Sequence, residues 1–131
     1  MPSKIVKTDA EWRARLTPLQ YNVARRRGTE RAFSGEYCRH RAPGVYACVC
    51  CGSRLFASTD KLEDDSGWPS FRQALAPETV RLDEDYAWMT RSIEASCARC
   101  DAHLGHALDD GPGGRRFCIN SASLRFEPGA S

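Results

Sequence analysis

The feature that most constrains this 131-residue chain is a pair of Cys-x-x-Cys motifs. Cys48 and Cys51 form the first motif, Cys97 and Cys100 form the second, and 45 residues separate the two. Four thiolates in this pattern are typical of a tetrahedral zinc site, in which each sulfur lies about 2.3 Å from the metal. A compact zinc ribbon has only about 15–20 residues between its pairs. The longer gap therefore predicts a clamp that joins two separate parts of a fold.

The predicted metal site is a closed one. Because the protein supplies all four ligands, no coordination position remains for a substrate, and we expect a structural Zn²⁺. A site of this kind contributes on the order of 10 kcal/mol to the stability of the fold. The third thiol of "CVCC", Cys50, would break the two-residue spacing, and we expect it to pack beside the motif as a spare thiol. A pair of motifs that has lost its metal is the alternative interpretation.

The cysteine content also bears on location and partners. "MPSKIVKTDAEW" has no apolar segment of a secretory signal, and no stretch reaches the roughly 18 apolar residues of a membrane helix. We therefore expect a cytoplasmic protein, in which seven cysteines indicate metal binding or catalysis before disulfides. The net charge of +2 favours neither nucleic acid nor membrane as a partner. We expect residues 1–131 to form a single domain and a monomer.

The first 30 residues are expected to be helical. "TDAE" and "TPLQ" are capping boxes, and the second has Pro18 at the first helical position. Trp12 lies on the apolar face of the first helix, and Leu19 and Val23 form the apolar stripe of the second. Gly28 is expected to end that helix.

From residue 32 onward the chain reads as short strands separated by Gly, Pro and Asp. This spacing favours antiparallel β structure over βαβ units. "RLDEDYAW" is expected to hold a turn between two strands, and a change of apolar phase predicts a bulge or bend near "NSAS". The strand-like runs are "GVYAC", "SRLFAS", "TVRLD", "YAWMTRSIEAS", "RFCIN" and "SLRFEP".

One cysteine lies apart from the others. If "RRFCIN" is a strand, Arg116, Cys118 and Asn120 share one face, while Phe117 and Ile119 point into the core. A nearby guanidinium favours the thiolate, which is the nucleophilic form of cysteine. The alternative is that Cys118 is a small buried hydrophobe.

Three further features suggest catalysis. His103 and His106 lie three residues apart in "HLGH", and histidine is the side chain that most readily moves protons near neutral pH. Asp110 follows closely and can orient an imidazole. Trp68 in "GWPSF" belongs either to the core or to the wall of a small apolar pocket.

Together these stretches resemble the methionine sulfoxide reductase B family. The resemblance runs from about Leu16 to Pro128 through "GTERAFSGEY", "YACVCCGSRLFAS", "GWPSF", "HLGH" and "DGPGGRRFCINSASLRF". It implies a mainly β fold, in which two antiparallel sheets pack around a core with N-terminal α-helices and a four-cysteine zinc clamp. The zinc would lie away from the active site.

The resemblance also implies an activity, the reduction of the R epimer of methionine sulfoxide in oxidised proteins. Cys118 falls at the catalytic cysteine and would become a sulfenic acid. His103 is the expected proton donor, with His106 and Asp110 arranging the donors, while Trp68 would close over the methyl group. The residues expected around Cys118 are His103, His106, Asp110, Arg116 and Asn120.

The chain departs from the family at one position. Many members carry a second cysteine directly before "GWPSF", where this chain has Ser66, and serine cannot form a disulfide. Another cysteine, an external thiol or poor turnover are the possible outcomes. With five cysteines assigned, Cys38 and Cys50 remain, and we expect Cys38, in a polar and turn-rich segment, to resolve Cys118. Thioredoxin as the reductant is carried over from the family.

Two other functions fit part of the sequence. A zinc-stapled β domain that binds RNA or a peptide would use the arginines, but it does not require Cys118, two histidines and Trp68 together. A zinc hydrolase or deaminase needs an open coordination position and often shows H-x-E, a motif that this sequence lacks.

Overall fold

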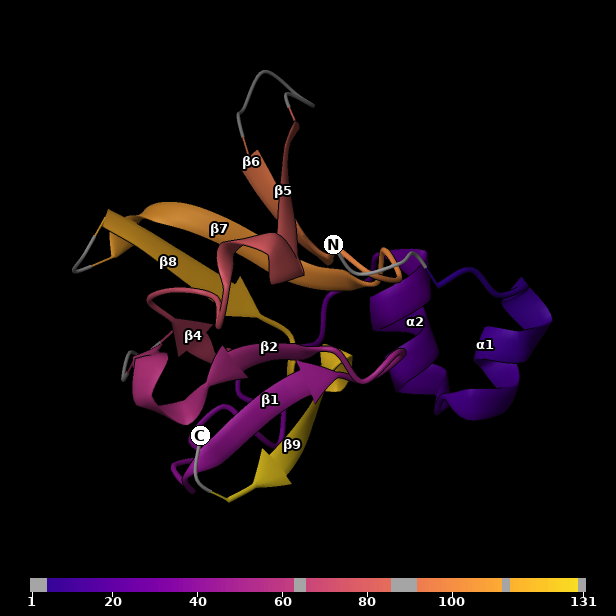
Figure 1. The fold of residues 1–131 in the computed structure, drawn as a ribbon, viewed down its shortest axis with the longest axis horizontal. Helices are drawn as coiled ribbons and strands as arrows, with labels where there is room; N and C mark the ends of the chain where they lie inside the picture. The colour runs from indigo at the N-terminus through magenta and orange to yellow at the C-terminus, as the bar shows by residue number, and fades with distance from the viewer. Residues whose placement is uncertain (1–4, 63–65, 86–91, 112–113, 130–131) are drawn as a thin grey trace.

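The computed structural model describes residues 5–62, 66–85, 92–111 and 114–129. Two antiparallel sheets lie beside two helices (Figure 1), which confirms the expected mainly β architecture. The smaller sheet has the order β2-β1-β9 and consists of β1 (Gly44–Cys48), β2 (Arg54–Ala57) and β9 (Leu124–Pro128). The larger has the order β3-β4-β8-β7-β6-β5 and consists of β3 (Lys61–Leu62), β4 (Ser70–Phe71), β5 (Val80–Asp85), β6 (Ser92–Cys97), β7 (His103–Gly111) and β8 (Gly114–Ile119).

Both helices begin at the predicted capping boxes. Helix α1 spans Asp9–Arg15 and α2 spans Pro18–Arg26, each with reciprocal bonds between the cap and the third helical residue. Val23 is buried as expected, but Leu19 is 55% exposed, because α2 packs its Tyr21–Val23–Ala24 side against the sheet. Arg27, with a φ of 61°, forms the left-handed cap in place of Gly28. No helix among the described residues combines the length and apolarity needed to cross a membrane.

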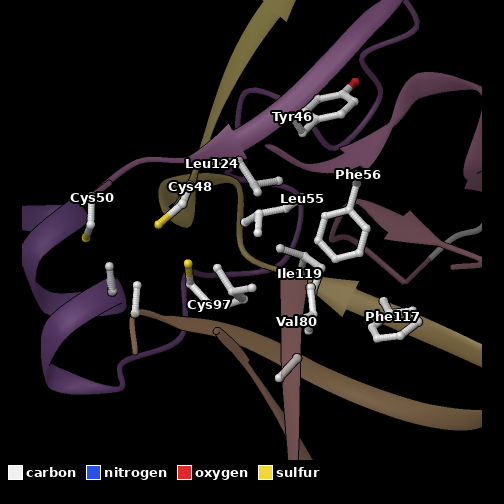
Figure 2. Close-up of a cluster of buried hydrophobic side chains, with 14 of the residues drawn as sticks. Tyr46, Cys48, Cys50, Leu55, Phe56, Val80, Cys97, Phe117, Ile119 and Leu124 are labelled. Carbon is white, nitrogen blue, oxygen red and sulfur yellow. The ribbon is translucent and has the colours of Figure 1, made fainter. Parts of the chain in front are cut away.

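Aromatic side chains join the two sheets. Phe56 of β2 stacks on Phe71 of β4 with ring centroids 4.4 Å apart, and both are fully buried. Figure 2 shows Leu55, Phe56, Ile119 and Leu124 gathered in this core, next to the sulfurs of Cys48 and Cys97. Burying a side chain of this size stabilises the fold by roughly 1.5–3 kcal/mol.

The longest described strand, β7, is not among the predicted runs. Its sequence "HLGHALDDG" lacks regular alternation, and its central Gly105 weakens the strand pattern. Of the "RLDEDYAW" stretch expected to hold a turn, residues 81–85 belong to β5 and residues 86–88 lie outside the described residues. Near "NSAS" the chain makes a 3₁₀ turn, η4 (Ser121–Ser123), which leads from the larger sheet into the smaller one.

Candidate active site and metal centre

Cys118 lies in the middle of a row of side chains that crosses the larger sheet. It is paired in register with Ser70 of β4 on one side and with His106 of β7 on the other. Directly opposed residues in antiparallel strands share a face, with Cβ atoms about 4.5–5.5 Å apart. His106 is in turn paired with Glu94 of β6, so a hydroxyl, a thiol, an imidazole and a carboxylate follow one another across the sheet.

The strand β8 places Cys118 outside the core. Phe117 and Ile119 are 7% and 0% exposed and point inward, as predicted, whereas Cys118 is half-buried. Arg116, two residues earlier on the same face, donates from Nη1 to the Ser70 hydroxyl at 3.4 Å. The thiol is therefore placed among polar groups at a partly open surface, which is where a reactive cysteine is expected.

The two imidazoles have different surroundings. Their ring centroids lie 5.8 Å apart. His103 is only 4% exposed, and burial, with smaller contributions from His106 and Arg27, lowers its pKa to about 4. Burial and then Arg27 also lower the pKa of the half-buried His106. Both rings are therefore neutral at neutral pH, and each has one N–H and one unprotonated nitrogen.

Gly105, between the two histidines, allows β7 and β8 to approach closely at the thiol. A Cβ at this position would lie 2.1 Å from the carbonyl oxygen of Cys118, which is closer than atoms can pack. The glycine of "HLGH" is thus required by the strand pairing that brings His106 beside Cys118. Asp110 lies four residues beyond His106 in β7, about 13 Å along the strand. Its side chain lies outside the described residues, so its orienting role stays a prediction.

Asn120 binds backbone groups. Its Nδ2 donates to the Leu104 carbonyl at 3.0 Å, its Oδ1 accepts from the Glu30 amide at 3.0 Å, and it is 3% exposed. The two hydrogen bonds use both ends of the side-chain amide, and they connect β7 to the segment that contains Glu30. We therefore assign Asn120 a positioning role.

Glu30 was not predicted from the sequence. This residue is 3% exposed, and its Oε1 accepts from the Ala122 amide at 2.8 Å. Its backbone carbonyl accepts from the Trp68 indole Nε1 at 3.0 Å. Glu30 therefore connects the tryptophan to the turn that follows Cys118. The only hint in the sequence was that Glu30 is an acidic residue among several arginines.

The "GWPSF" segment is fixed beside the row. Trp68 is half-buried, and its carbonyl accepts from the Ser66 hydroxyl at 3.1 Å. The Ser66 Oγ also lies 3.4 Å from the Ser70 Oγ. Because Ser70 is the direct neighbour of Cys118, position 66 lies close to the thiol.

Cys38 occupies a turn in residues 27–43, all of them described and none in a helix or strand. It is a half-buried thiol whose carbonyl accepts from the Lys61 ammonium at 3.1 Å. The preceding Tyr37 donates its amide to the Ser121 hydroxyl at 3.2 Å. The chain next to Cys38 thus contacts a residue only three positions beyond Cys118.

The four cysteines of the predicted clamp come together. All their sulfurs lie within 4.8 Å of one another, and the Cys48–Cys100 and Cys51–Cys97 sulfur pairs are each 3.6 Å apart. A zinc tetrahedron with bonds of about 2.3 Å has sulfur–sulfur edges of about 3.8 Å, so the cluster fits this metal. Cys48 ends β1 and Cys97 ends β6, so the cluster joins the two sheets, as Figure 2 shows for these two sulfurs.

Cys50 lies outside the four-sulfur cluster. It is 2% exposed and packs against the cluster, in contact with the side chains of Cys48 and Cys100. A hydrogen bond with the Cys100 sulfur, together with burial, raises the pKa of Cys50 to about 11, although hydrogen bonds with Cys48 and, less strongly, Arg25 oppose this shift. Cys50 is therefore a protonated, enclosed thiol.

The fold, the row of side chains around Cys118 and the four-cysteine cluster can now be compared with known proteins. The SelR domain model matches residues 16–128 of this chain. The chain belongs to the methionine sulfoxide reductase B family.

Curated relatives extend this similarity. The peptide methionine sulfoxide reductase MsrB of Thiobacillus denitrificans is 52% identical over 93% of this chain and 94% of its own length. The corresponding protein of Pseudomonas aeruginosa is 51% identical over 96% and 97%. The mitochondrial methionine-R-sulfoxide reductase B3 of Mus musculus is 49% identical over 98% of this chain. This chain spans about half of the mouse protein, 51% of its length.

Proposed function

We propose that this chain, an oxidoreductase of the methionine-R-sulfoxide reductase type, uses Cys118 as its nucleophile to reduce the R epimer of methionine sulfoxide in proteins. The observation that carries the proposal is the register of Ser70, Cys118 and His106 across the sheet. This register gives a partly exposed thiol an imidazole as its direct neighbour. Such a pair is the arrangement that activates a cysteine.

In the first step the Cys118 thiolate attacks the sulfoxide, and the oxygen passes to the cysteine sulfur. The sulfur–oxygen bond of the substrate breaks, methionine leaves as the thioether, and Cys118 becomes a sulfenic acid. The substrate gains two electrons and Cys118 loses two. Because the oxygen acquires a proton during this transfer, a positioned donor accelerates the step by about 10²–10⁴-fold.

The geometry favours His106 as that donor over His103, the residue expected from the sequence. His106 is neutral in the resting site and pairs directly with Cys118. It therefore takes the thiol proton from Cys118 and delivers it to the departing oxygen, so the protons balance. His103 is almost fully buried, and its ring packs edge-on against the His106 ring, which helps to position it.

Substrate selection depends on Trp68 and on the polar groups around the thiol. Trp68, held by the Glu30 carbonyl, forms the apolar wall for the methyl group. His106 on the β7 side of Cys118, and Arg116, which binds the Ser70 hydroxyl on the β4 side, are the polar groups proposed to bind the oxygen. Because the methyl group and the oxygen need different partners, only one epimer presents its sulfur to Cys118.

The second step removes the sulfenic acid. The Cys38 thiol attacks the Cys118 sulfur, a disulfide forms and water leaves; thioredoxin then reduces the disulfide. Cys38 is half-buried in a turn segment, whereas Cys50 is enclosed beside the metal cluster. A disulfide needs Cα atoms within about 7 Å of each other, so Cys38 and Cys118 have to reach that separation during this step.

The four-cysteine cluster holds a structural Zn²⁺ in this proposal, with Cys48, Cys51, Cys97 and Cys100 as its ligands. The metal joins the two sheets and takes no part in the redox steps. The proposed location is the cytoplasm, where thioredoxin and oxidised proteins are available as partners.

The test is a rate assay with thioredoxin on peptides that carry each epimer of methionine sulfoxide. Wild type should turn over the R epimer and leave the S epimer unchanged. Cys118→Ser should lose all activity, and Cys38→Ser should release about one methionine per chain and then stall. Turnover of the R epimer by Cys118→Ser would refute the nucleophile, and sustained thioredoxin turnover by Cys38→Ser would refute the resolving cysteine alone.

A further inference from the structure

The last turn of α2 contacts the second cysteine motif. The Arg25 Nη1 donates to the carbonyl oxygen of Cys100 at 3.0 Å and lies 3.8 Å from the Cys100 sulfur. Cys100 is 1% exposed, so the contact is shielded from water. A guanidinium is thus placed against a sulfur that belongs to the four-cysteine cluster.

The same guanidinium also touches the other helix. It lies over the ring of Trp12 in α1, 4.4 Å from the ring centroid, and Trp12 is 3% exposed. A cation in this position is attracted to the negative face of the indole ring. Arg25 is therefore held between α1 and the cysteine motif, with its planar group in contact with both.

A second link joins the N-terminal segment to the same motif. The Ile5 amide donates to the Arg99 carbonyl at 2.7 Å, next to the carbonyl that Arg25 binds. Two consecutive carbonyls of the Cys97–Cys100 motif are thus bound by residues from the N-terminal region. The motif is fixed from the helical side as well as from the sheet.

The charge of the cluster explains why a cation belongs there. Four thiolates around a divalent zinc carry a net charge of about −2. A buried charge of this size is stabilised by a nearby opposite charge that also donates hydrogen bonds. Partners that bind the ligands of a metal in this way fix the ligand geometry and typically contribute a factor of about 10–100 to metal affinity.

We propose that Arg25 is an outer-sphere partner of the four-cysteine metal site, which couples the docking of the N-terminal helices to metal binding. The proposal rests on the zinc occupancy proposed above. Because coupling between two equilibria is reciprocal, bound metal strengthens the docking of α1 and α2, and docked helices strengthen metal binding.

The test compares zinc affinity in purified full-length variants by competition with a chromophoric chelator. Arg25→Met should bind zinc about 10–100-fold more weakly than wild type. Arg26→Met is the matched control, because it removes the same charge from an exposed position in the same helical turn. The affinity of Arg26→Met should stay within about twofold of wild type; equal affinities for the two variants would overturn the proposal.

Cobalt provides a second readout that helix packing alone would not change. In cobalt-loaded protein the thiolate-to-metal charge-transfer bands should shift in Arg25→Met and stay unchanged in Arg26→Met. If Arg25→Met fails to fold, Arg25→Lys decides the question. Lysine keeps the charge but has no planar group to span Trp12 and Cys100, so a smaller loss of zinc affinity is expected, and wild-type affinity would overturn the proposal.

Measuring the zinc content of the purified protein distinguishes failure of the Arg25 proposal from failure of the zinc proposal. Wild type without tightly bound zinc would overturn the zinc clamp itself. Zinc-loaded wild type with undiminished affinity in Arg25→Met would overturn only the role of Arg25. Neither result depends on the activity of Cys118.

Discussion

At the scale of single residues, the imidazoles of His103 and His106 differ in burial. His103 is almost completely enclosed, and its pKa is lowered from 6.5 to about 4, with burial as the largest cause. His106 lies next to the thiol and is half-buried. A neutral His106 can accept the thiol proton, and this is the first requirement of the proposed reaction.

The lowered pKa of His103 makes the stability of the fold depend on pH. Between pH 6.5 and pH 4 the unfolded chain binds a proton that the folded chain does not, so the free energy of unfolding falls as the pH falls through this range. The loss attributable to His103 is at most about 3 kcal/mol. Urea unfolding of wild type and His103→Asn across this range should show a shallower loss in the variant.

Acid also weakens metal binding by the cysteines, but that effect is common to both proteins and cancels in their difference. Identical slopes for wild type and His103→Asn would contradict the assigned environment of His103.

At the scale of elements, the segment from Ser66 to Ser70 lies against the strand of the nucleophile. Ser66 is one hydroxyl contact from Ser70, which is itself the direct neighbour of Cys118. The chain therefore holds position 66 within reach of the thiol without giving it a sulfur. Position 66 therefore cannot resolve the sulfenic acid in this protein, and Cys38 is the proposed source of the resolving thiol.

This geometry predicts a rescue. In the Cys38→Ser background, Ser66→Cys should restore multiple turnover with thioredoxin, because a thiol at position 66 can reach Cys118 with a small movement. Ser58→Cys is the matched control, since the Ser58 hydroxyl is bound to the Gly44 amide of β1. A Ser66→Cys variant that stalls after one turnover like its parent would contradict this placement. Peptide mapping of the oxidised rescue variant should find a disulfide between positions 66 and 118.

The elements show where sequence reasoning works and where it fails. Strand β1 and both helix starts were predicted, because a short apolar run after a Pro-Gly turn and capping boxes are local signals. Strand β7 was not, because Gly105 and the histidines serve the pairing with β8 and break the local pattern. The close approach of β8 requires a glycine at position 105, and such a requirement does not appear as a regular apolar pattern in the sequence of β7.

The candidate site follows the same division. The four cysteines and Cys118 could be named from residue type and spacing, because their chemistry is specific to cysteine. The place of Asn120 near the thiol stays a prediction, and its hydrogen bonds with the Leu104 carbonyl and the Glu30 amide could not be read from the sequence. Glu30 itself was missed, because its role depends on contacts with Trp68 and Ala122, which are far away in the sequence.

At the scale of the whole molecule, the cysteine cluster links the two sheets at one end. Cys48 belongs to the smaller sheet and Cys97 to the larger one, while Arg25 connects the helices to the same point. The stacked aromatic residues Phe56 and Phe71 join the sheets elsewhere. The cysteine cluster, where a structural Zn²⁺ is proposed, and the aromatic core hold the layers together, and the proposed redox residue Cys118 lies on the outer face of one of them.

Removal of the metal should therefore affect the whole fold. Zinc binding contributes on the order of 10 kcal/mol, whereas a domain of this size has a total stability of about 5–15 kcal/mol. Chelation under reducing conditions should lower the melting temperature sharply or unfold the protein. Cys48→Ser should behave like the chelated protein, while Cys50→Ser should bind zinc and melt like wild type. A chelated protein that melts like the zinc-loaded one would contradict the clamp.

The central claim is that Cys118 takes the oxygen from the substrate. Its most direct test is the intact mass of Cys38→Ser after incubation with a peptide carrying R-methionine sulfoxide and no reductant. The account predicts one methionine released per chain and a mass gain of about 16 Da that maps to Cys118. With the S epimer, no mass gain is expected. Methionine release without any oxidation at Cys118 would contradict the account.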